Sequence, residues 1–154
     1  FRRTTDRVVH ERLGKLPLDV GADRIARTAL AALQMLQRLR DHHGERIPLA
    51  WNVRDIAPLA AIEVYPAGTL TSRGVTSSGY KLASDRSVRE AMLDALADEL
   101  VVGPHRPTLL QHADVLDATL CLLAASDFLQ GAVMQPDDHA LAMHEGWIWV
   151  RPPA

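Results

Sequence analysis

Residues 109–129 read LLQHADVLDATLCLLAASDFL, an apolar run that carries an acidic pair. At about 100° per residue, its strongly apolar members fall on one arc of a helix: Leu109, Ala113, Leu116, Leu120, Leu123, Ala124 and Phe128. Asp117 lies inside that arc and Asp114 lies at its edge, three residues away and on the same face. Buried carboxylates are normally paired, protonated or bound to a metal ion. The run therefore predicts one helix, ending near Gln130, whose acidic pair requires an explanation.

Length and composition are those of a single globular domain, which we expect to span residues 1–154. The net charge of −2 does not favour a strongly basic nucleic-acid surface, although it leaves room for a local basic patch. The single cysteine, Cys121, cannot form an internal disulfide, which favours a reducing, cytoplasmic location. No apolar stretch approaches the roughly 20 residues that span a bilayer, so we expect no membrane partner.

Three further segments have helical periodicity. The first is a short helix that Thr4 or Thr5 caps and Gly14 ends. The second covers residues 22–41 and has an apolar stripe made of Ile25, Ala29, Ala32, Leu33, Leu36 and Leu39. The third covers residues 87–100, with Ser84 or Ser87 as its cap.

Two segments favour extended structure. Residues 59–65 are apolar except for Glu63, which is typical of a strand buried on both faces of an α/β sheet. The alternative is an edge strand on which Glu63 points to water. Near the end of the sequence, residues 147–150 favour a short strand, and Trp147 and Trp149 would share one face as core residues.

The three unusual carboxylates are Glu63, Asp114 and Asp117. Carboxylate oxygens suit Mg²⁺ or Mn²⁺, and two such ions about 4 Å apart can promote phosphodiester hydrolysis. The alternative is that the acidic pair on the helix is simply solvated. The sequence lacks the GxSxG, HExxH, CxxC and GxGxxG motifs, which leaves other common catalytic classes without support.

Four segments together resemble the predicted RNase H-like nuclease family, long catalogued as a domain of unknown function. They are residues 1–7, FRRTTDR; 62–67, IEVYPA, followed by 79–81, GYK; 112–118, HADVLDA; and 145–150, EGWIWV. They occur in the family's order across nearly the whole sequence. The resemblance implies an α/β, RNase H-like mixed sheet with flanking helices.

The resemblance also implies an acidic two-metal site of the kind found in RuvC-type Holliday-junction resolvases. In such a site Glu63 matches the strand glutamate, and Asp114 and Asp117 match the helix pair. All three would be catalytic metal ligands for Mg²⁺ or Mn²⁺, and nucleic acid would be the substrate. Lys81, Arg3 and Arg7 are candidates for phosphate contacts, and surface solvation is the alternative role for each of them.

The family also has a first-strand aspartate on a β-meander, and no β-like segment occurs here before residue 45. We therefore expect the N-terminal strands to be missing from this sequence. Such a fragment would be inactive as a nuclease and would expose a sheet edge, through which copies of the chain could associate. The competing hypothesis is a non-catalytic module for nucleotide binding or protein assembly.

Overall fold

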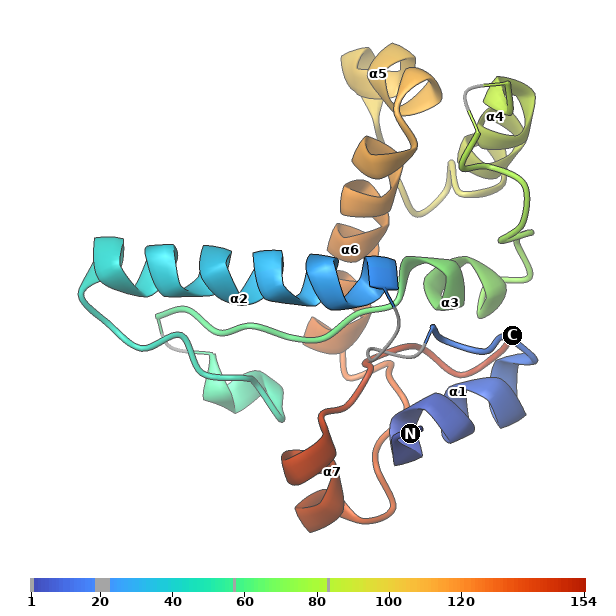
Figure 1. Cartoon of the computed structure of the whole chain (residues 1–154). Coiled ribbons are helices and arrows are strands. Elements are labelled where there is room, and N and C mark those ends of the chain that lie inside the picture. Colours follow the sequence, from blue (N-terminus) through green and yellow to red (C-terminus); the bar gives the residue numbers. More distant parts are fainter. Residues whose placement is uncertain (1, 19–22, 57, 83) are drawn as a thin grey trace.

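The computed structural model describes residues 2–18, 23–56, 58–82 and 84–154, apart from the side chains of residues 23–25. Of the described residues, 56% lie in helices and only 3% in strand, so the architecture is helical (Figure 1). The helices are α1 (Thr4–Leu13), α2 (Asp23–His43), η1 (Val53–Asp55), α3 (Pro66–Thr71), α4 (Arg86–Ala95), η2 (Gly103–His105), α5 (Arg106–Gln111), α6 (Ala113–Leu129) and α7 (His139–Glu145). None of the helices in the described part is long and apolar enough to cross a membrane.

The predicted α/β mixed sheet is wrong. The described residues contain isolated parallel bridges between Leu49 and Ala61 and between Glu63 and Ile148, and no sheet. The apolar run 59–65 is extended, but each bridge holds only one residue pair. The backbone N–H of Ile148 donates to Thr5 Oγ1 at 2.9 Å, which takes it out of any strand ladder. Because no sheet forms in the described part, the sheet edge predicted for association of copies is also absent there.

All three further predicted helices form, but the predicted N-terminal caps of the first and the third are wrong. Residue Arg3, and not a threonine, precedes α1, and its backbone N–H donates to Asp6 Oδ2 at 3.0 Å. Gly14 ends α1 with a φ of 64°, as predicted. Helix α4 follows Asp85 and ends at Ala95, five residues before the predicted end.

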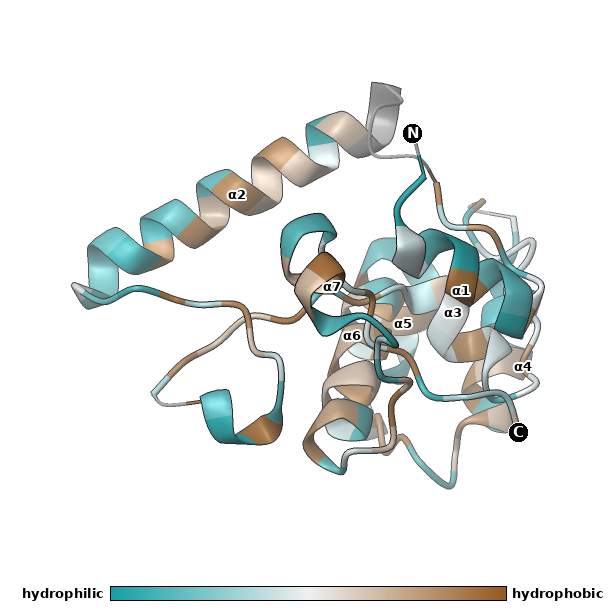
Figure 2. Ribbon diagram, turned by 90° about the horizontal axis from the view of Figure 1, so that it is seen from below, coloured by the Kyte–Doolittle hydropathy of each residue, from teal (hydrophilic) through white to brown (hydrophobic). Residues whose placement is uncertain are grey.

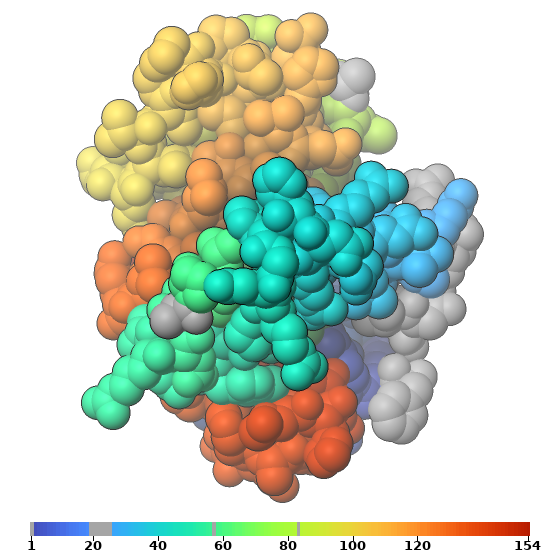
Figure 3. Space-filling model, turned by 90° about the vertical axis from the view of Figure 1, so that its left-hand side faces the viewer, coloured from blue at the N-terminus to red at the C-terminus, as the bar shows by residue number. Residues whose placement is uncertain are grey.

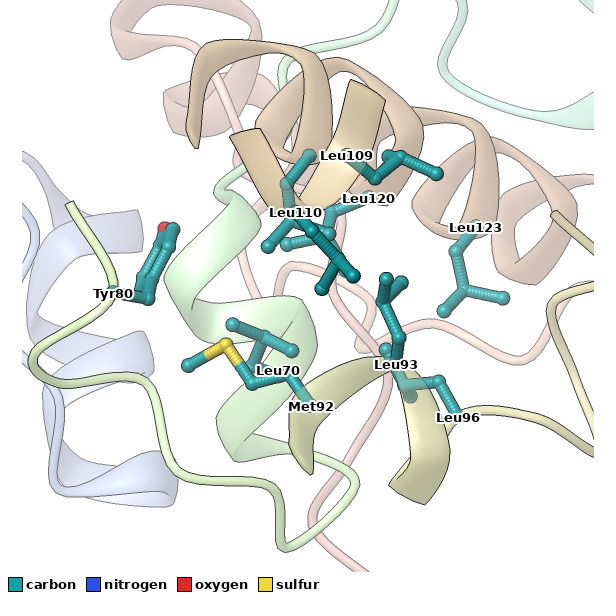
Figure 4. Close-up of a cluster of buried hydrophobic side chains, with 10 residues drawn as sticks. Leu70, Tyr80, Met92, Leu93, Leu96, Leu109, Leu110, Leu120 and Leu123 are labelled. Carbon is teal, nitrogen blue, oxygen red and sulfur yellow. The ribbon is translucent and has the colours of Figure 1, made fainter. Parts of the chain in front are cut away.

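The run 109–129 forms two helices, so the prediction of one continuous helix is wrong. His112 has extended backbone angles, with φ −124° and ψ 109°, and separates α5 from α6. Within α6 the apolar arc nevertheless faces the core, as its spacing predicts, and Leu116 and Leu120 are completely buried. The main core joins α3, α4, α5 and α6 (Figure 4) and consists of Leu70, Tyr80, Met92, Leu93, Leu96, Leu109, Leu110, Leu116, Leu120 and Leu123.

The prediction that Trp147 and Trp149 are core residues is confirmed. Trp147 and Trp149 are both buried in one second cluster together with Phe128, whose ring centroid lies 5.0 Å from that of Trp149. They are core residues, and no base could stack on them at this burial.

A buried ion pair connects the C-terminal half of α6 to the turn after α3. Arg73 Nη2 lies 2.7 Å from Asp127 Oδ1, and both side chains are almost fully buried. Arg73 also pairs with Glu99, which in turn accepts from Arg151 at 3.1 Å. Within the described part, Asp127 Oδ2 has no hydrogen-bond partner.

Helix α2 stands apart from the remaining helices (Figures 1 and 2). The apolar stripe predicted for this helix is not buried: Ala29 and Leu36 are half-buried, whereas Ala32, Leu33 and Leu39 are exposed. The side chain of Ile25, also predicted in this stripe, lies outside the described residues. No described residue of α2 belongs to any of the three buried apolar clusters.

Candidate functional site

The structure distributes the six predicted site residues over two clusters and two separate positions. Glu63 lies against Arg3, and Asp117 lies against Lys81, so each of these carboxylates pairs with a predicted phosphate-contact cation. The other two residues lie elsewhere. Arg7 donates from Nη2 to Thr4 Oγ1 at 3.2 Å within α1, and Asp114 is exposed in the first turn of α6.

In the first cluster the Arg3 guanidinium holds two acidic side chains. Its Nη1 and Nη2 donate to Glu63 Oε2 at 2.8 Å and Oε1 at 2.7 Å, a two-pronged contact that matches the planar fork of arginine. Its Nη2 also donates to Asp6 Oδ1 at 3.1 Å. The hydrogen bonds to Glu63 are the main cause of a raised pKa for Arg3. The cluster therefore ties the start of α1 to the extended segment that contains Glu63.

The end of α7 closes this cluster. The backbone N–H of Thr4 donates to Glu145 Oε2 at 2.7 Å and lowers the pKa of Glu145. Gly146 follows with a φ of 87°, and a Cβ added there would lie 3.0 Å from both Arg3 Nη1 and Glu63 Oε2. The positive φ favours glycine at position 146, and a larger residue there would also push against the ends of the Arg3 and Glu63 side chains.

The second cluster lies where the loop before α4 meets the first turns of α6. Tyr80 donates its hydroxyl hydrogen to Asp117 Oδ1 at 2.7 Å, and Lys81 Nζ binds Asp117 Oδ2. Burial, followed by the hydrogen bond to Asp117, raises the pKa of Tyr80. Burial is also the main cause of the raised pKa of Cys121, one turn further along α6, and the nearby Asp117 carboxylate adds to it.

A buried arginine fixes the loop of the second cluster. Arg89, only 1% exposed, donates to the carbonyl oxygens of Tyr80 at 2.6 Å, Leu82 at 2.8 Å and Leu110 at 2.8 Å. Arg89 is not among the residues that we predicted from the sequence. A signal was present, because Arg89 occupies the inward stripe of α4 at positions 89, 92, 93 and 96, where a charge is anomalous.

Tyr80 and Asp6 were also missed as members of the two clusters. Tyr80 precedes the selected Lys81, and its place in an otherwise polar loop was the available signal. Asp6 lies three residues after Arg3, which is the spacing of a helix-start pair. Tyr80 is a second partner of Asp117, beside Lys81, and Asp6 is a second partner of Arg3, beside Glu63.

The carboxylates do not form a metal-binding group in the described part of the chain. There, no three histidine, cysteine, aspartate or glutamate side chains are placed to hold a metal ion. Each of Glu63 and Asp117 faces an internal cation, and the side chain of Asp114 makes no hydrogen bond or ion pair with the described residues. The donor set therefore does not fit a two-metal centre as it stands, and a metal role for these residues stays a prediction.

Comparison with known proteins provides a family but no described activity. No curated protein and no solved structure matches the chain. A family model described as "Protein of unknown function (DUF429)" matches residues 1–140, which is most of the sequence. The chain therefore belongs to the family of proteins of unknown function called DUF429.

Proposed function

We propose that this chain is a non-catalytic assembly module that associates with a second copy of itself through α2. The observation that carries this proposal is the exposure of large apolar side chains along a 21-residue helix. Leu30, Leu33 and Met35 are 57%, 63% and 56% exposed, and Leu39 is 38% exposed. Leu30 and Leu33 share one side of the helix, and Met35 and Leu39 lie on the other side. Exposed apolar surface concentrated on one element is typical of an interaction site.

The state of the two acidic clusters supports a non-catalytic function. Glu63 is neutralised by Arg3 and Asp117 by Lys81, which is how structural ion pairs are arranged. The same cations leave neither carboxylate free to act as a base or as a ligand.

The oligomeric state as a function of concentration tests this proposal. Light scattering coupled to size exclusion should show the wild type shifting from monomer to dimer as its concentration rises. The double variant Leu30→Ser/Leu33→Ser should stay monomeric over the same range. Leu82→Ser is a matched control, because Leu82 is 66% exposed but lies outside α2, and it should dimerise like the wild type. A wild type that stays monomeric throughout would contradict the proposal.

As a second function we propose hydrolysis of nucleic-acid phosphodiester bonds that depends on Mg²⁺ or Mn²⁺. What favours it is the sequence: three of the four segments that resemble the predicted nuclease family lie within residues 1–140, the part that matches the family model. Because the described carboxylates do not converge, we derive no reaction step through a metal.

Calorimetric titration with Mn²⁺ distinguishes the two functions. Heat of binding that disappears in Asp114→Ala and Asp117→Ala would support the nuclease. Absence of binding heat in the wild type would contradict the nuclease function and leave the assembly function alone.

A further inference from the structure

A cleft of about 370 Å³ lies between residues 8–12 of α1, the loop 134–137 after α6 and residues 152–153. We call it the α1 cleft. Its volume falls within the range of roughly 300–1,000 Å³ that small-molecule sites occupy. In Figure 1, α1 and the C-terminal end lie side by side, across the molecule from the projecting end of α2. Figure 3 shows the face that carries α2, in cyan, and only part of α1, in dark blue, is visible behind it.

The floor of the α1 cleft is apolar. Val8 and Met134 are half-buried, and Trp147 is buried beneath them. Pro152 and Pro153 form one wall, and because proline has no backbone N–H, this wall offers no donor of its own. An apolar group is therefore the occupant that fits the floor.

Hydrogen bonds within the chain hold the walls of the cleft in place. The backbone N–H of Met134 donates to the carbonyl oxygen of Val150 at 2.9 Å, and Trp147 Nε1 donates to the carbonyl oxygen of Met134 at 3.0 Å. The N–H of Ala154 donates to the carbonyl oxygen of Ser72 at 3.1 Å, which fixes the proline wall. A ligand therefore meets a preformed site, and little ordering of the chain opposes its binding.

Four polar side chains border the opening of the cleft, and all four are exposed: Glu11, Arg12, Gln135 and Asp137. Within the described part of the chain, none of them takes part in a hydrogen bond or an ion pair. Glu11 and Arg12 lie on the same face of α1 as Val8, which they follow by three and four residues. The cleft thus combines one unpaired cation and two unpaired carboxylates with an apolar floor.

These charges select the class of ligand. A simple anion would be repelled by Glu11 and Asp137, and a simple cation would leave Arg12 without a partner. A molecule that carries a carboxylate and an ammonium group close together supplies a partner for both kinds of charge. Its carboxylate matches the planar fork of the Arg12 guanidinium, and its ammonium group matches the carboxylates.

We infer that the α1 cleft binds a free α-amino acid with an apolar side chain. Arg12 holds its carboxylate, Glu11 and Asp137 hold its ammonium group, and its side chain covers the floor over Trp147. The end of a peptide carries only one of the two charges at its terminal residue, so it would leave part of the opening unpaired. This inference goes beyond the proposed assembly function and is independent of it, because no described residue of α2 lines the cleft.

Binding of free and blocked amino acids tests the inference. The probes are L-leucine, L-methionine and L-phenylalanine, and binding is followed by the shifts of amide NMR signals from α1 and from residues 134–137. At least one probe should bind there with a dissociation constant below about 1 mM. Glycine, which has both charges but no apolar side chain, should bind at least about tenfold more weakly.

The blocked forms of the best probe test each charge separately. Its N-acetyl derivative lacks the ammonium group, and its amide lacks the carboxylate. Each should bind at least about fivefold more weakly than the free amino acid, because one kind of charge in the cleft is left without a partner. Dissociation constants above about 1 mM for all three probes, or blocked forms that bind as tightly, would overturn the inference.

Charge-neutralising variants assign the contacts. In Arg12→Gln the amide should bind as well as the free amino acid, and in Glu11→Gln/Asp137→Asn the N-acetyl derivative should do so. Arg86→Gln and Glu90→Gln, at exposed positions on α4, are matched controls that should keep the wild-type preferences. Cleft variants that also keep them would overturn the inference. Circular dichroism checks the folds, which should be unchanged because all the substituted side chains are exposed.

Discussion

At the scale of single residues, the buried carboxylate of Asp127 is paired with one cation, Arg73. It is 5% exposed, and Arg73 Nη2 lies 2.7 Å from its Oδ1. Replacing Asp127 by alanine leaves the buried guanidinium of Arg73 with only the partly exposed Glu99 as an acidic partner. We expect Asp127→Ala to lower the free energy of unfolding by about 3 kcal/mol, as measured by urea denaturation.

An exposed ion pair provides the control for this variant. Asp94 is 66% exposed and pairs with Arg106. Asp94→Ala should change the free energy of unfolding by less than about 1 kcal/mol. If Asp127→Ala and Asp94→Ala lowered the free energy of unfolding by similar amounts, burial of the Arg73–Asp127 pair would contribute nothing to stability.

Tyr80 makes a prediction about pH. Burial, followed by the hydrogen bond to Asp117, raises the pKa of Tyr80 in the folded chain. A raised pKa means that the fold prefers the protonated phenol, so this stabilisation is complete below the unfolded value of about 10. It is lost as the pH rises through the folded pKa. The free energy of unfolding should therefore fall in alkaline solution, above about pH 10.

Tyrosinate absorbance in a Tyr65→Phe background isolates Tyr80, because Tyr65 also has a pKa raised by burial. In this background Asp117→Asn should lower the pKa of Tyr80, since it removes a charge and a charged acceptor that both raise it. An unchanged Tyr80 titration in Asp117→Asn would show that the hydrogen bond is not formed in solution.

At the scale of elements, α6 offers two leucines with opposite environments. Leu120 is fully buried in the main core, and Leu122, two residues later, is 69% exposed. Leu120→Ala should lower the free energy of unfolding by about 3 kcal/mol, because it removes packing and leaves a cavity. Leu122→Ala should change the stability of the monomer by less than about 0.5 kcal/mol. Equal effects in thermal or urea unfolding would contradict the orientation of α6.

The same helix shows what periodicity can and cannot predict. Apolar spacing identified the inward side of α6, because one helical face must cover the core. It did not reveal the extended His112, because Leu109 and Leu110 of α5 remain buried on the far side of the break. Because the residues on both sides of the break at His112 pack into the same core, the apolar spacing in the sequence shows no interruption there.

Residues 59–65 present the opposite case. Their apolar run predicted a strand buried on both faces of a sheet, and this is wrong: the segment is extended, but none of its residues is fully buried. A sheet also requires neighbouring segments with free donors. Ile148 gives its N–H to Thr5, and the pairing stops after one residue on each side. Partners of a strand lie far away in the sequence, so local composition cannot establish them.

At the scale of the whole molecule, α2 should be the least protected long helix. An isolated helix is only marginally stable in water, and α2 lacks the buried face that supports α6. We expect amide hydrogen exchange in α2 to be faster than in α6 in dilute solution. Exchange in α2 should slow as concentration rises and dimers form. Protection of α2 that equals that of α6 at every concentration would contradict this prediction.

The sequence identified members of the two acidic clusters, but not how they are arranged. It selected Glu63 and Asp117 as a joint site and assigned Arg3 and Lys81 to phosphate. The structure instead pairs each carboxylate with one of these cations, in clusters built from different elements. Residue type and burial pattern reveal which charges need a partner, whereas the tertiary path of the chain decides which partner each receives.

Arg89 has a consequence for experiments on the loop before α4. Its guanidinium donates hydrogen bonds to the main-chain oxygens of Tyr80 and Leu82, on both sides of Lys81. These bonds fix the path of the loop and do not involve the side chain of Lys81. The backbone around position 81 is therefore held independently of the side chain there. Substitutions of Lys81 should remove its pairing with Asp117 while leaving the course of the loop unchanged.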